Sequence, residues 1–97
     1  MLSNADIGLR MTRLREARGL TTVALGQLVG ISQAQVSRLE NGRQGFRSFT
    51  LARIAESLDV PPFYLLMSDE EWEIYQTGLA AWGRPRVDVP SFGGERV

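Results

Sequence analysis

Apolar residues recur along the first two-thirds of the chain with the spacing of short amphipathic helices. Ile7, Met11 and Leu14, for example, stand at i, i+4 and i+7 and so lie on one side of a helix. Glycines, an Asn-Gly pair and a Pro-Pro pair interrupt the pattern and mark the ends of the segments. The pattern predicts five helices, at about residues 6–18, 22–29, 33–40, 49–58 and 61–66.

The connections between these predicted helices are short, and no stretch shows the alternation expected of a strand. Short connections favour helices that pack against their sequence neighbours. We therefore expect the fold class to be all-α, with residues 1–66 forming one compact five-helix domain.

Polar residues at the predicted helix starts have the character of N-caps. Asn4 or Asp6 can cap the first helix, and Thr21 can cap the second. Ser32 precedes the third helix, and Gln35 stands three residues later, which is the spacing of a capping box. These signals support the predicted boundaries.

A sixth helix is predicted at residues 69–82. Ser68 and Glu71 have the spacing of a second capping box, and acidic residues fill the first turn, where the helix dipole favours negative charge. Beyond this helix the apolar pattern stops, and Gly and Pro become frequent. We expect residues 67–82 to form a C-terminal amphipathic helix and residues 83–97 to form an extended, flexible tail.

Four apolar residues form a stripe along one face of the predicted sixth helix: Trp72, Tyr75, Leu79 and Trp82. Such a stripe most often packs on its own domain. Two tryptophans and a tyrosine so close together are also typical of the core of a protein interface. Two interpretations therefore remain open at this stage, an internal core or a surface for a dimer or a partner protein.

The composition excludes several kinds of chemistry. The 97 residues include no cysteine and no histidine, so a disulfide framework, a Cys/His zinc site, a Cys nucleophile and a His base are all excluded. No nucleophile–base pair or metal-binding cluster stands out, and we expect no enzyme activity, no metal and no cofactor. No apolar run has transmembrane length and no signal-peptide pattern opens the chain, so we expect a cytoplasmic protein without a membrane partner.

The formal net charge is zero, but the charges are unevenly placed. Residues 1–66 carry eight arginines and five acids, for a net +3, and residues 67–97 carry three arginines and six acids, for a net −3. All eleven basic residues are arginine, whose planar fork suits phosphate and guanine. Arg10, Arg13 and Arg18 are predicted to form a solvated face of the first helix.

The predicted third helix has one apolar side and one unusual polar side. With Gln33 set at zero, the outward arc from about 0° to 140° holds uncharged polar side chains, one methyl and one guanidinium. These residues are Gln33, Ala34, Ser37 and Arg38. The helix at 22–29, a three-residue turn and this helix form a helix-turn-helix unit that holds the arc outward.

A DNA major groove admits one α-helix, and each base pair displays there its own pattern of donors, acceptors and methyl groups. Gln33 can pair with adenine through two hydrogen bonds, and Arg38 can pair with guanine or reach a phosphate. Ser37 can donate or accept, and Ala34 can contact a thymine methyl. We therefore expect these four residues to read DNA bases.

The stretches IGLRMTRLREARGLT and LGQLVGISQAQVSRLENGR resemble the Cro/repressor-type helix-turn-helix domains, often called the XRE family. The likeness covers about residues 6–66, and the run SQxxxSRxENG is its most specific part. It implies a five-helix domain, sequence-specific operator binding, a dimeric state and transcriptional regulation. In that family the first residues of the third helix read bases, which here are Gln33 and Ala34, followed one turn later by Ser37 and Arg38.

The resemblance also implies residues that hold the DNA backbone and residues that support the fold. The backbone contacts correspond to Thr22, Asn41 and Arg43, with Arg47 in the following loop, and a structural ion pair corresponds to Arg15 and Glu40. The family often has Gln where Thr22 stands, which favours a weaker or water-mediated phosphate contact here. It usually has Ala where Gly26 stands, and glycine costs a helix about 1 kcal/mol in propensity.

These observations predict a DNA-binding transcription regulator, specifically a repressor that binds a short palindromic operator on double-stranded DNA as a homodimer. The alternative is an antitoxin or another protein-interaction module that keeps the fold but uses residues 68–97 to bind a partner protein. The two functions are compatible. The sequence identifies neither the operator nor an effector.

Overall fold

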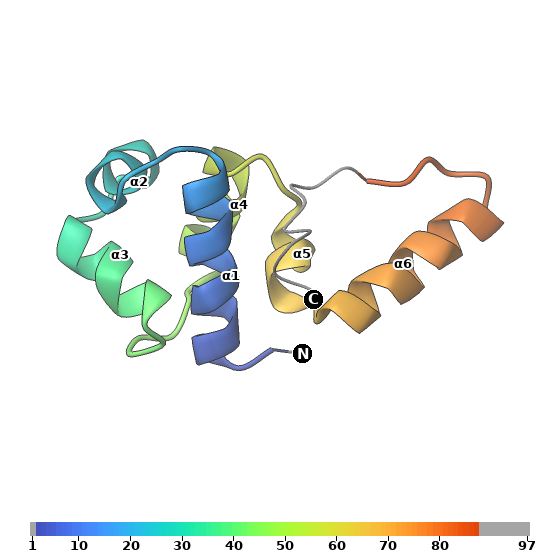
Figure 1. The fold of residues 1–97 in the computed structure, drawn as a ribbon, viewed down its shortest axis with the longest axis horizontal. Helices are drawn as coiled ribbons and strands as arrows, with labels where there is room; N and C mark the ends of the chain where they lie inside the picture. The colour runs from blue at the N-terminus through green and yellow to red at the C-terminus, as the bar shows by residue number, and fades with distance from the viewer. Residues whose placement is uncertain (1, 88–97) are drawn as a thin grey trace.

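The computed structural model describes residues 2–87, which form six helices and contain no strand. The helices are α1 (Asn4–Ala17), α2 (Thr22–Val29), α3 (Gln33–Glu40), α4 (Ser48–Ser57), α5 (Pro62–Leu66) and α6 (Asp69–Ala81). Figure 1 shows α2 and α3 at one end of the molecule, α1 and α4 in the middle and α6 at the opposite end. The all-α prediction is confirmed, and α2 and α3 have the predicted boundaries.

The start of α1 differs from the prediction. Ser3, rather than Asn4 or Asp6, is the N-cap, because Ser3 has extended backbone angles and its Oγ accepts a hydrogen bond from the Asp6 N–H at 3.2 Å. Asn4 is already helical, and the Asp6 carboxylate accepts from the Ser3 hydroxyl at 2.9 Å. The helix therefore begins two residues before the predicted start.

The other predicted caps are present. Thr21 Oγ1 accepts from the Ala24 N–H at 3.0 Å, and Ser32 Oγ accepts from the Gln35 N–H at 3.0 Å. For Ser32 and Gln35 only this half of the predicted capping box forms, because the Gln35 side chain does not bond back to the Ser32 N–H. At α6 both halves of the capping box form, since Ser68 Oγ accepts from the Glu71 N–H and the Ser68 N–H donates to Glu71. Each cap satisfies a backbone group that the first turn of a helix leaves unpaired.

One apolar core joins all six helices. Its fully buried side chains include Met11 and Leu14 of α1, Leu25 of α2, Leu39 of α3 and Ile54 of α4, each with no exposed surface. These are the inward positions that the helical periodicity predicts. Among residues 2–87, no helix has both the length and the apolar character that a membrane crossing needs.

One arginine of α1 is buried rather than solvated, contrary to the prediction. Arg10 is 9% exposed, its Nη2 lies 2.7 Å from Asp69 Oδ1, and its guanidinium lies 4.4 Å from the centre of the Tyr64 ring. Arg18, the C-cap of α1, is exposed as predicted, and its Nε also donates to the carbonyl of Leu58 at 2.9 Å, just beyond α4. A long aliphatic stem lets an arginine bury its body while its head finds a partner, and periodicity alone does not reveal the partner.

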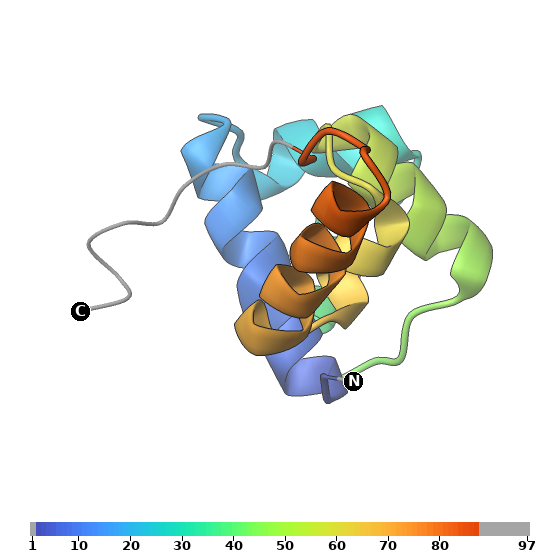
Figure 2. The ribbon, with the colours of Figure 1, turned by 90° about the vertical axis from the view of Figure 1, so that its right-hand side faces the viewer.

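Helix α6 is attached to the rest of the molecule through Trp72. This side chain is 4% exposed, and its ring lies 4.9 Å from that of Tyr64 and 5.9 Å from that of Phe63, both in α5. Together with the ion pair between Arg10 and Asp69, these contacts fix the first turn of α6. Figure 2 shows α6 on the outer side of the molecule, in front of the other helices.

The residues after α6 turn back along it. Gln76 is 2% exposed, and its amide group accepts from the Val87 N–H at 2.9 Å and donates to the Val87 carbonyl at 2.7 Å. Arg86 forms an exposed ion pair with Glu73. The structure thus shows residues 84–87 without regular secondary structure, and the remainder of the predicted tail lies outside the described residues.

The apolar stripe of α6 divides into two parts. Trp72 belongs to the internal core, and Tyr75 is half-buried against Phe63, with ring centres 5.0 Å apart. Leu79 is half-buried, whereas Trp82 is 84% exposed. The internal-core interpretation therefore holds for the first part of the stripe only.

Candidate nucleic-acid interface

The turn between α2 and α3 is three residues long, and the two helices pack against each other. Leu25 and Val29 of α2 and Val36 of α3 are buried. Gly30 ends α2 with a φ of +85°, a conformation that glycine adopts without strain. A Cβ on Gly26 would lie 2.7 Å from the carbonyl oxygen of Ile31, so this position requires glycine. The close packing of the helix-turn-helix unit therefore explains why α2 contains Gly26, although glycine has a low helix propensity.

Helix α3 presents the predicted polar face to solvent. Val36 and Leu39 have no exposed surface, whereas all four predicted base-reading residues are exposed: Gln33, Ala34, Ser37 and Arg38. Gln35, at the edge of this face, is half-buried beside the cap that Ser32 provides. The face therefore has the width and the composition that the helical projection predicts.

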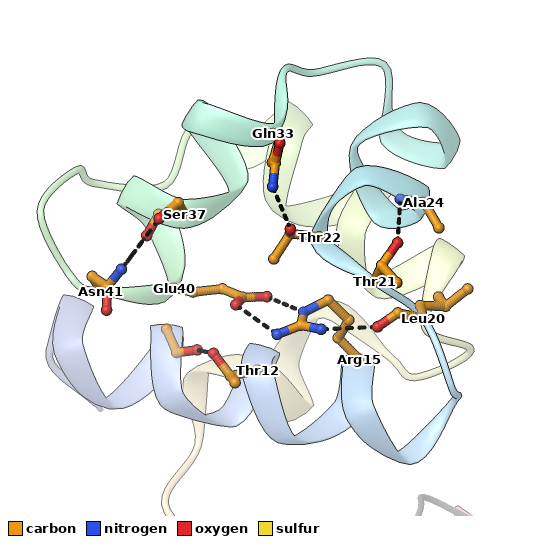
Figure 3. Close-up of polar contacts among 11 residues, drawn as sticks. Thr12, Arg15, Leu20, Thr21, Thr22, Ala24, Gln33, Ser37, Glu40 and Asn41 are labelled. Atoms are coloured by element: carbon orange, nitrogen blue, oxygen red, sulfur yellow. Dashed lines mark hydrogen bonds and ion pairs between the residues drawn. The ribbon is translucent and has the colours of Figure 1, made fainter.

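The side chain of Gln33 is held by the neighbouring helix. Its Nε2 donates to Thr22 Oγ1 at 3.1 Å, which joins the N-terminal residues of α2 and α3 (Figure 3). A primary amide carries two N–H groups and a carbonyl oxygen, so one N–H and Oε1 remain available. The contact thus orients Gln33 without using the donor–acceptor pair that adenine would require.

Behind this face, α3 is tied to α1 by an ion pair with two hydrogen bonds. Arg15 Nε lies 2.7 Å from Glu40 Oε2, and Arg15 Nη2 lies 3.1 Å from Glu40 Oε1 (Figure 3). The third guanidinium nitrogen donates to the Leu20 carbonyl at 2.8 Å. The two side chains are 12% and 8% exposed, and the hydrogen bonds to Glu40 raise the pKa of Arg15 above its ordinary value.

Helices α1 and α3 also approach each other closely at a glycine. A Cβ on Gly8 would lie 2.4 Å from the Leu39 carbonyl oxygen and 2.5 Å from that of Glu40. The Gly8 carbonyl accepts from Thr12 Oγ1 at 3.0 Å. Sequence reasoning missed the role of Gly8, because a glycine inside a helical pattern gives no sign of which backbone approaches it.

The end of α3 is shaped by contacts that limit two of the predicted DNA contacts. Asn41 Nδ2 donates to the Ser37 carbonyl at 2.8 Å, so the side chain of Asn41 closes α3 (Figure 3). Arg38 Nε donates to Gln44 Oε1 at 3.1 Å, which leaves the other guanidinium nitrogens for a ligand. Gln44 was not predicted as a site residue, and its place six residues after Arg38 in a loop gave no signal.

The remaining predicted backbone contacts flank the face. Thr22 is half-buried at the start of α2, next to Gln33. Arg43 is exposed and follows Gly42, whose φ of +71° ends α3. Arg47 is exposed and precedes α4, at the far end of the loop that follows α3. Within residues 2–87, no group of Asp and Glu side chains could hold a metal ion.

Comparison with known proteins identifies the architecture. Residues 6–62 match the family described as "Helix-turn-helix domain". The HTH-type transcriptional repressor RghR of Bacillus subtilis is 40% identical over 57 residues, which are 58% of this chain and 42% of that protein. An uncharacterized transcriptional regulator in the ATPase CF(0) region of Rhodospirillum rubrum is 30% identical over 90% of this chain and 83% of its own length.

Solved structures show the same fold. The P22 c2 repressor in complex with a synthetic operator superposes with a TM-score of 0.62 at 28% identity, covering 65% of this chain and 96% of that one. The restriction-modification controller protein C.AhdI of Aeromonas hydrophila superposes with a TM-score of 0.62 at 29% identity, covering 64% of this chain and 94% of that one. The chain spans less than half the length of RghR. These matches and the geometry of α2 and α3 show that the chain belongs to the helix-turn-helix domain family, in its Cro/repressor type.

Proposed function

We propose that this chain is a sequence-specific DNA-binding transcription regulator, a repressor that binds a short palindromic operator as a homodimer. The observation that carries the proposal is the outward face of α3, four exposed residues of which the first, Gln33, is oriented by Thr22. The similarity to RghR, a repressor, and to the P22 c2 repressor in complex with an operator supports it.

In this proposal α3 lies in the major groove. Gln33 uses its free N–H and Oε1 on adenine, and Arg38 uses its free guanidinium nitrogens on guanine or on a phosphate. Ser37 and Ala34, between them on the same face, contact neighbouring base edges or a thymine methyl. The apolar side of α3 and the ion pair between Arg15 and Glu40 hold the helix at a fixed angle during this contact.

The DNA backbone is held by residues around this face. The Thr22 hydroxyl accepts from Gln33 and still has its own proton to donate to a phosphate. Arg43 and Arg47, both exposed, supply positive charge on either side of the loop after α3. The Asn41 side chain donates to the Ser37 carbonyl at the end of α3. To donate this N–H to a phosphate instead, Asn41 would have to break that hydrogen bond.

The alternative function, a protein-interaction module such as an antitoxin, would use residues 68–97 rather than α3. One observation favours a protein contact there, the exposure of Trp82 at the end of α6. This alternative leaves the polar face of α3 without a purpose, so we rank it second.

The test is a selection of DNA by the purified chain from a pool of random duplexes, followed by fluorescence anisotropy. We expect enrichment of an inverted repeat and at least about a thousandfold tighter binding to it than to a scrambled duplex. Affinity should fall steeply as salt rises, since phosphate contacts release counterions. Enrichment of no sequence, with equal binding to selected and scrambled duplexes, would contradict the proposal.

A further inference from the structure

The glycines inside helices fall into two groups. Gly8 and Gly26 are required within the chain, since a Cβ on either would lie within 2.7 Å of a backbone oxygen. Gly78, in the middle of α6, has open space where a Cβ would be, with no atom within 4 Å. A glycine weakens a helix, so Gly78 costs α6 stability with no contact inside the residues that the structure describes to account for it.

Gly78 lies at the centre of an exposed apolar strip. Counted from Asp69, the strip occupies an arc of about 120° to 240° on α6. Its exposed members are Ile74, Gly78, Ala81 and Trp82, with the half-buried Tyr75 at its edge. Ile74 is 66% exposed and Trp82 is 84% exposed, which is unusual for side chains of this size.

The strip is hollowed at its glycine. Tyr75, Gly78, Leu79, Trp82 and Arg84 line a groove of about 440 Å³. Figure 1 shows α6 diverging from α5 toward its C-terminal end, so this half of the helix lies away from the other helices. The groove and the missing side chain at Gly78 leave room for a second helix to approach α6 closely.

The spacing of the strip is self-complementary. In an antiparallel pair of helices centred on Gly78, a residue four positions after the centre faces the residue four positions before it in the other helix. Trp82 therefore faces Ile74 of the partner subunit, and Ile74 faces Trp82 of the partner subunit. Gly78 faces its own copy, which lets the two backbones approach, and the contact closes with two-fold symmetry.

The charges at the ends of α6 favour the same arrangement. Glu70 lies in the first turn of α6, about 12 Å before Gly78 at a rise of 1.5 Å per residue. Arg84 lies just beyond the C-terminal end of the helix, where its N–H donates to the Leu79 carbonyl at 2.8 Å. Antiparallel pairing brings each Glu70 to the end of the partner helix where Arg84 of the partner subunit lies. Among residues 2–87, neither Glu70 nor Arg84 has an ion-pair partner of its own.

We propose that α6 is a self-association surface at which two copies of this chain pair antiparallel through Ile74, Gly78 and Trp82. The purpose of the pairing rests on the proposed function, because two DNA-reading helices in one particle match two half-sites. Trp72 and the ion pair between Arg10 and Asp69 attach α6 to the rest of the chain, so the pairing would also fix the separation of the two α3 helices.

The first test is sedimentation velocity of the full chain without DNA, over a range of concentrations. We expect a monomer–dimer equilibrium that Gly78→Arg abolishes and that Trp82→Ala weakens by about thirtyfold or more, the effect typical of a central interface residue. The matched control is Thr77→Arg, which adds the same charge one residue away on the exposed side outside the strip. Circular dichroism checks that each variant keeps its helices.

The second test fixes the orientation. The chain contains no cysteine, so single cysteines report pairing directly. We expect Gly78→Cys to form a disulfide-linked dimer, Ile74→Cys alone not to link, and Ile74→Cys mixed with Trp82→Cys to link. Glu70→Arg alone and Arg84→Glu alone should each weaken the dimer. The double variant, which exchanges the two charges, should restore it.

Several results would overturn this proposal. They are a 97-residue chain that stays monomeric at all concentrations, a dimer unaffected by Gly78→Arg, and a dimer linked through Ile74→Cys alone, which indicates parallel helices. A dimer lost instead in Phe49→Ala would place the interface on α4, where Phe49 is 72% exposed. A chain that dimerises through α6 but selects no DNA would contradict the proposed function and leave the α6 interface intact.

Discussion

Arg15 and Glu40 show how a charged pair stabilises the angle of the helix that carries the polar face. Both side chains are nearly buried, and the guanidinium makes three hydrogen bonds, two of them to the carboxylate. A buried charge without its partner is strongly unfavourable, so Arg15 and Glu40 must stay together and thereby hold α3 against α1. A pair of hydrophobic residues could give the same stability, but it would not define the position of α3 in this way.

We predict that Arg15→Ala lowers the free energy of unfolding by about 3 kcal/mol, because it leaves Glu40 buried without a counter-charge. The control is Arg86→Ala, which breaks an ion pair with Glu73 whose side chains are more than half exposed, and which should cost less than about 1 kcal/mol. Urea denaturation measures both. Equal losses in the two variants would show that Glu40 is solvated when Arg15 is removed.

At the scale of the helices, two glycines decide how closely the elements pack. Gly8 brings α1 onto the C-terminal end of α3, and Gly26 brings α2 onto the turn before α3. Both contacts act on α3, so its position depends on residues that do not lie on its exposed face.

We predict that Gly8→Ala destabilises the chain by about 1–3 kcal/mol, because the new Cβ would require the α3 backbone to move. The same substitution at Gly78 meets no atom within 4 Å and should raise helix stability by up to about 1 kcal/mol in dilute protein. Thermal unfolding of both variants gives the comparison. If Gly8→Ala is as stable as the wild type, the close approach of α1 and α3 is not needed.

The capping box of α6 gives a prediction about pH. The hydrogen bond from the Ser68 N–H lowers the pKa of Glu71 below its ordinary value of 4.5. A carboxyl whose pKa is lower in the folded state stabilises the fold above its unfolded pKa, and this stabilisation is lost as pH falls through the folded pKa. We expect the wild type to be more stable than Glu71→Gln near neutral pH and to lose this stability advantage as the pH drops below 4.5. Acid unfolding of both proteins measures the difference. An advantage that stays constant with pH would contradict the role of the carboxylate.

The sequence predicted the elements well because their signals are local. Helical periodicity and caps such as Thr21 and Ser32 depend on residues within one turn, and these predictions are confirmed. The exposed face of α3 followed from the same periodicity, since burial of Val36 and Leu39 leaves the other side in solvent.

What the sequence could not show are contacts between distant segments. Arg10 has the position of a surface residue in its own helix, yet it is buried beside Asp69, which lies 59 positions away. Arg18 is exposed, but its hydrogen bond to the Leu58 carbonyl, 40 positions away, has no local signal. The contact between Gln33 and Thr22 depends on the angle between α2 and α3, which no local pattern encodes. The choice between core and surface for the α6 stripe depends on the packing of α5 on Trp72, which is a contact between elements that periodicity does not encode.

At the scale of the whole molecule, the two proposed contacts lie at opposite ends. Figure 1 places α3 at one end and α6 at the other, with α1 and α4 between them. The proposed DNA contact and the proposed contact between subunits therefore use separate surfaces of one rigidly packed core. A substitution on one surface therefore leaves the residues of the other surface in place.

We predict that Arg43→Ala weakens binding to every duplex and reduces the slope of log affinity against log salt by about 0.9, the contribution of one phosphate contact. The control is Arg86→Ala, which removes the same charge from the segment after α6. Anisotropy titrations at several salt concentrations measure the slope. If the two variants have the slope of the wild type, Arg43 does not contact a phosphate.

The most direct measurement of the central claim is the base preference of Gln33→Ala compared with Gln35→Ala. Gln33 is exposed on the polar face, whereas Gln35 is half-buried at its edge. We predict that Gln33→Ala costs about 1–3 kcal/mol at the selected operator and relaxes the preference at one base pair of each half-site, while Gln35→Ala retains the wild-type preference. Equal losses by Gln33→Ala on the operator and on random DNA, with an unchanged base preference, would contradict the claim that α3 reads the sequence of DNA.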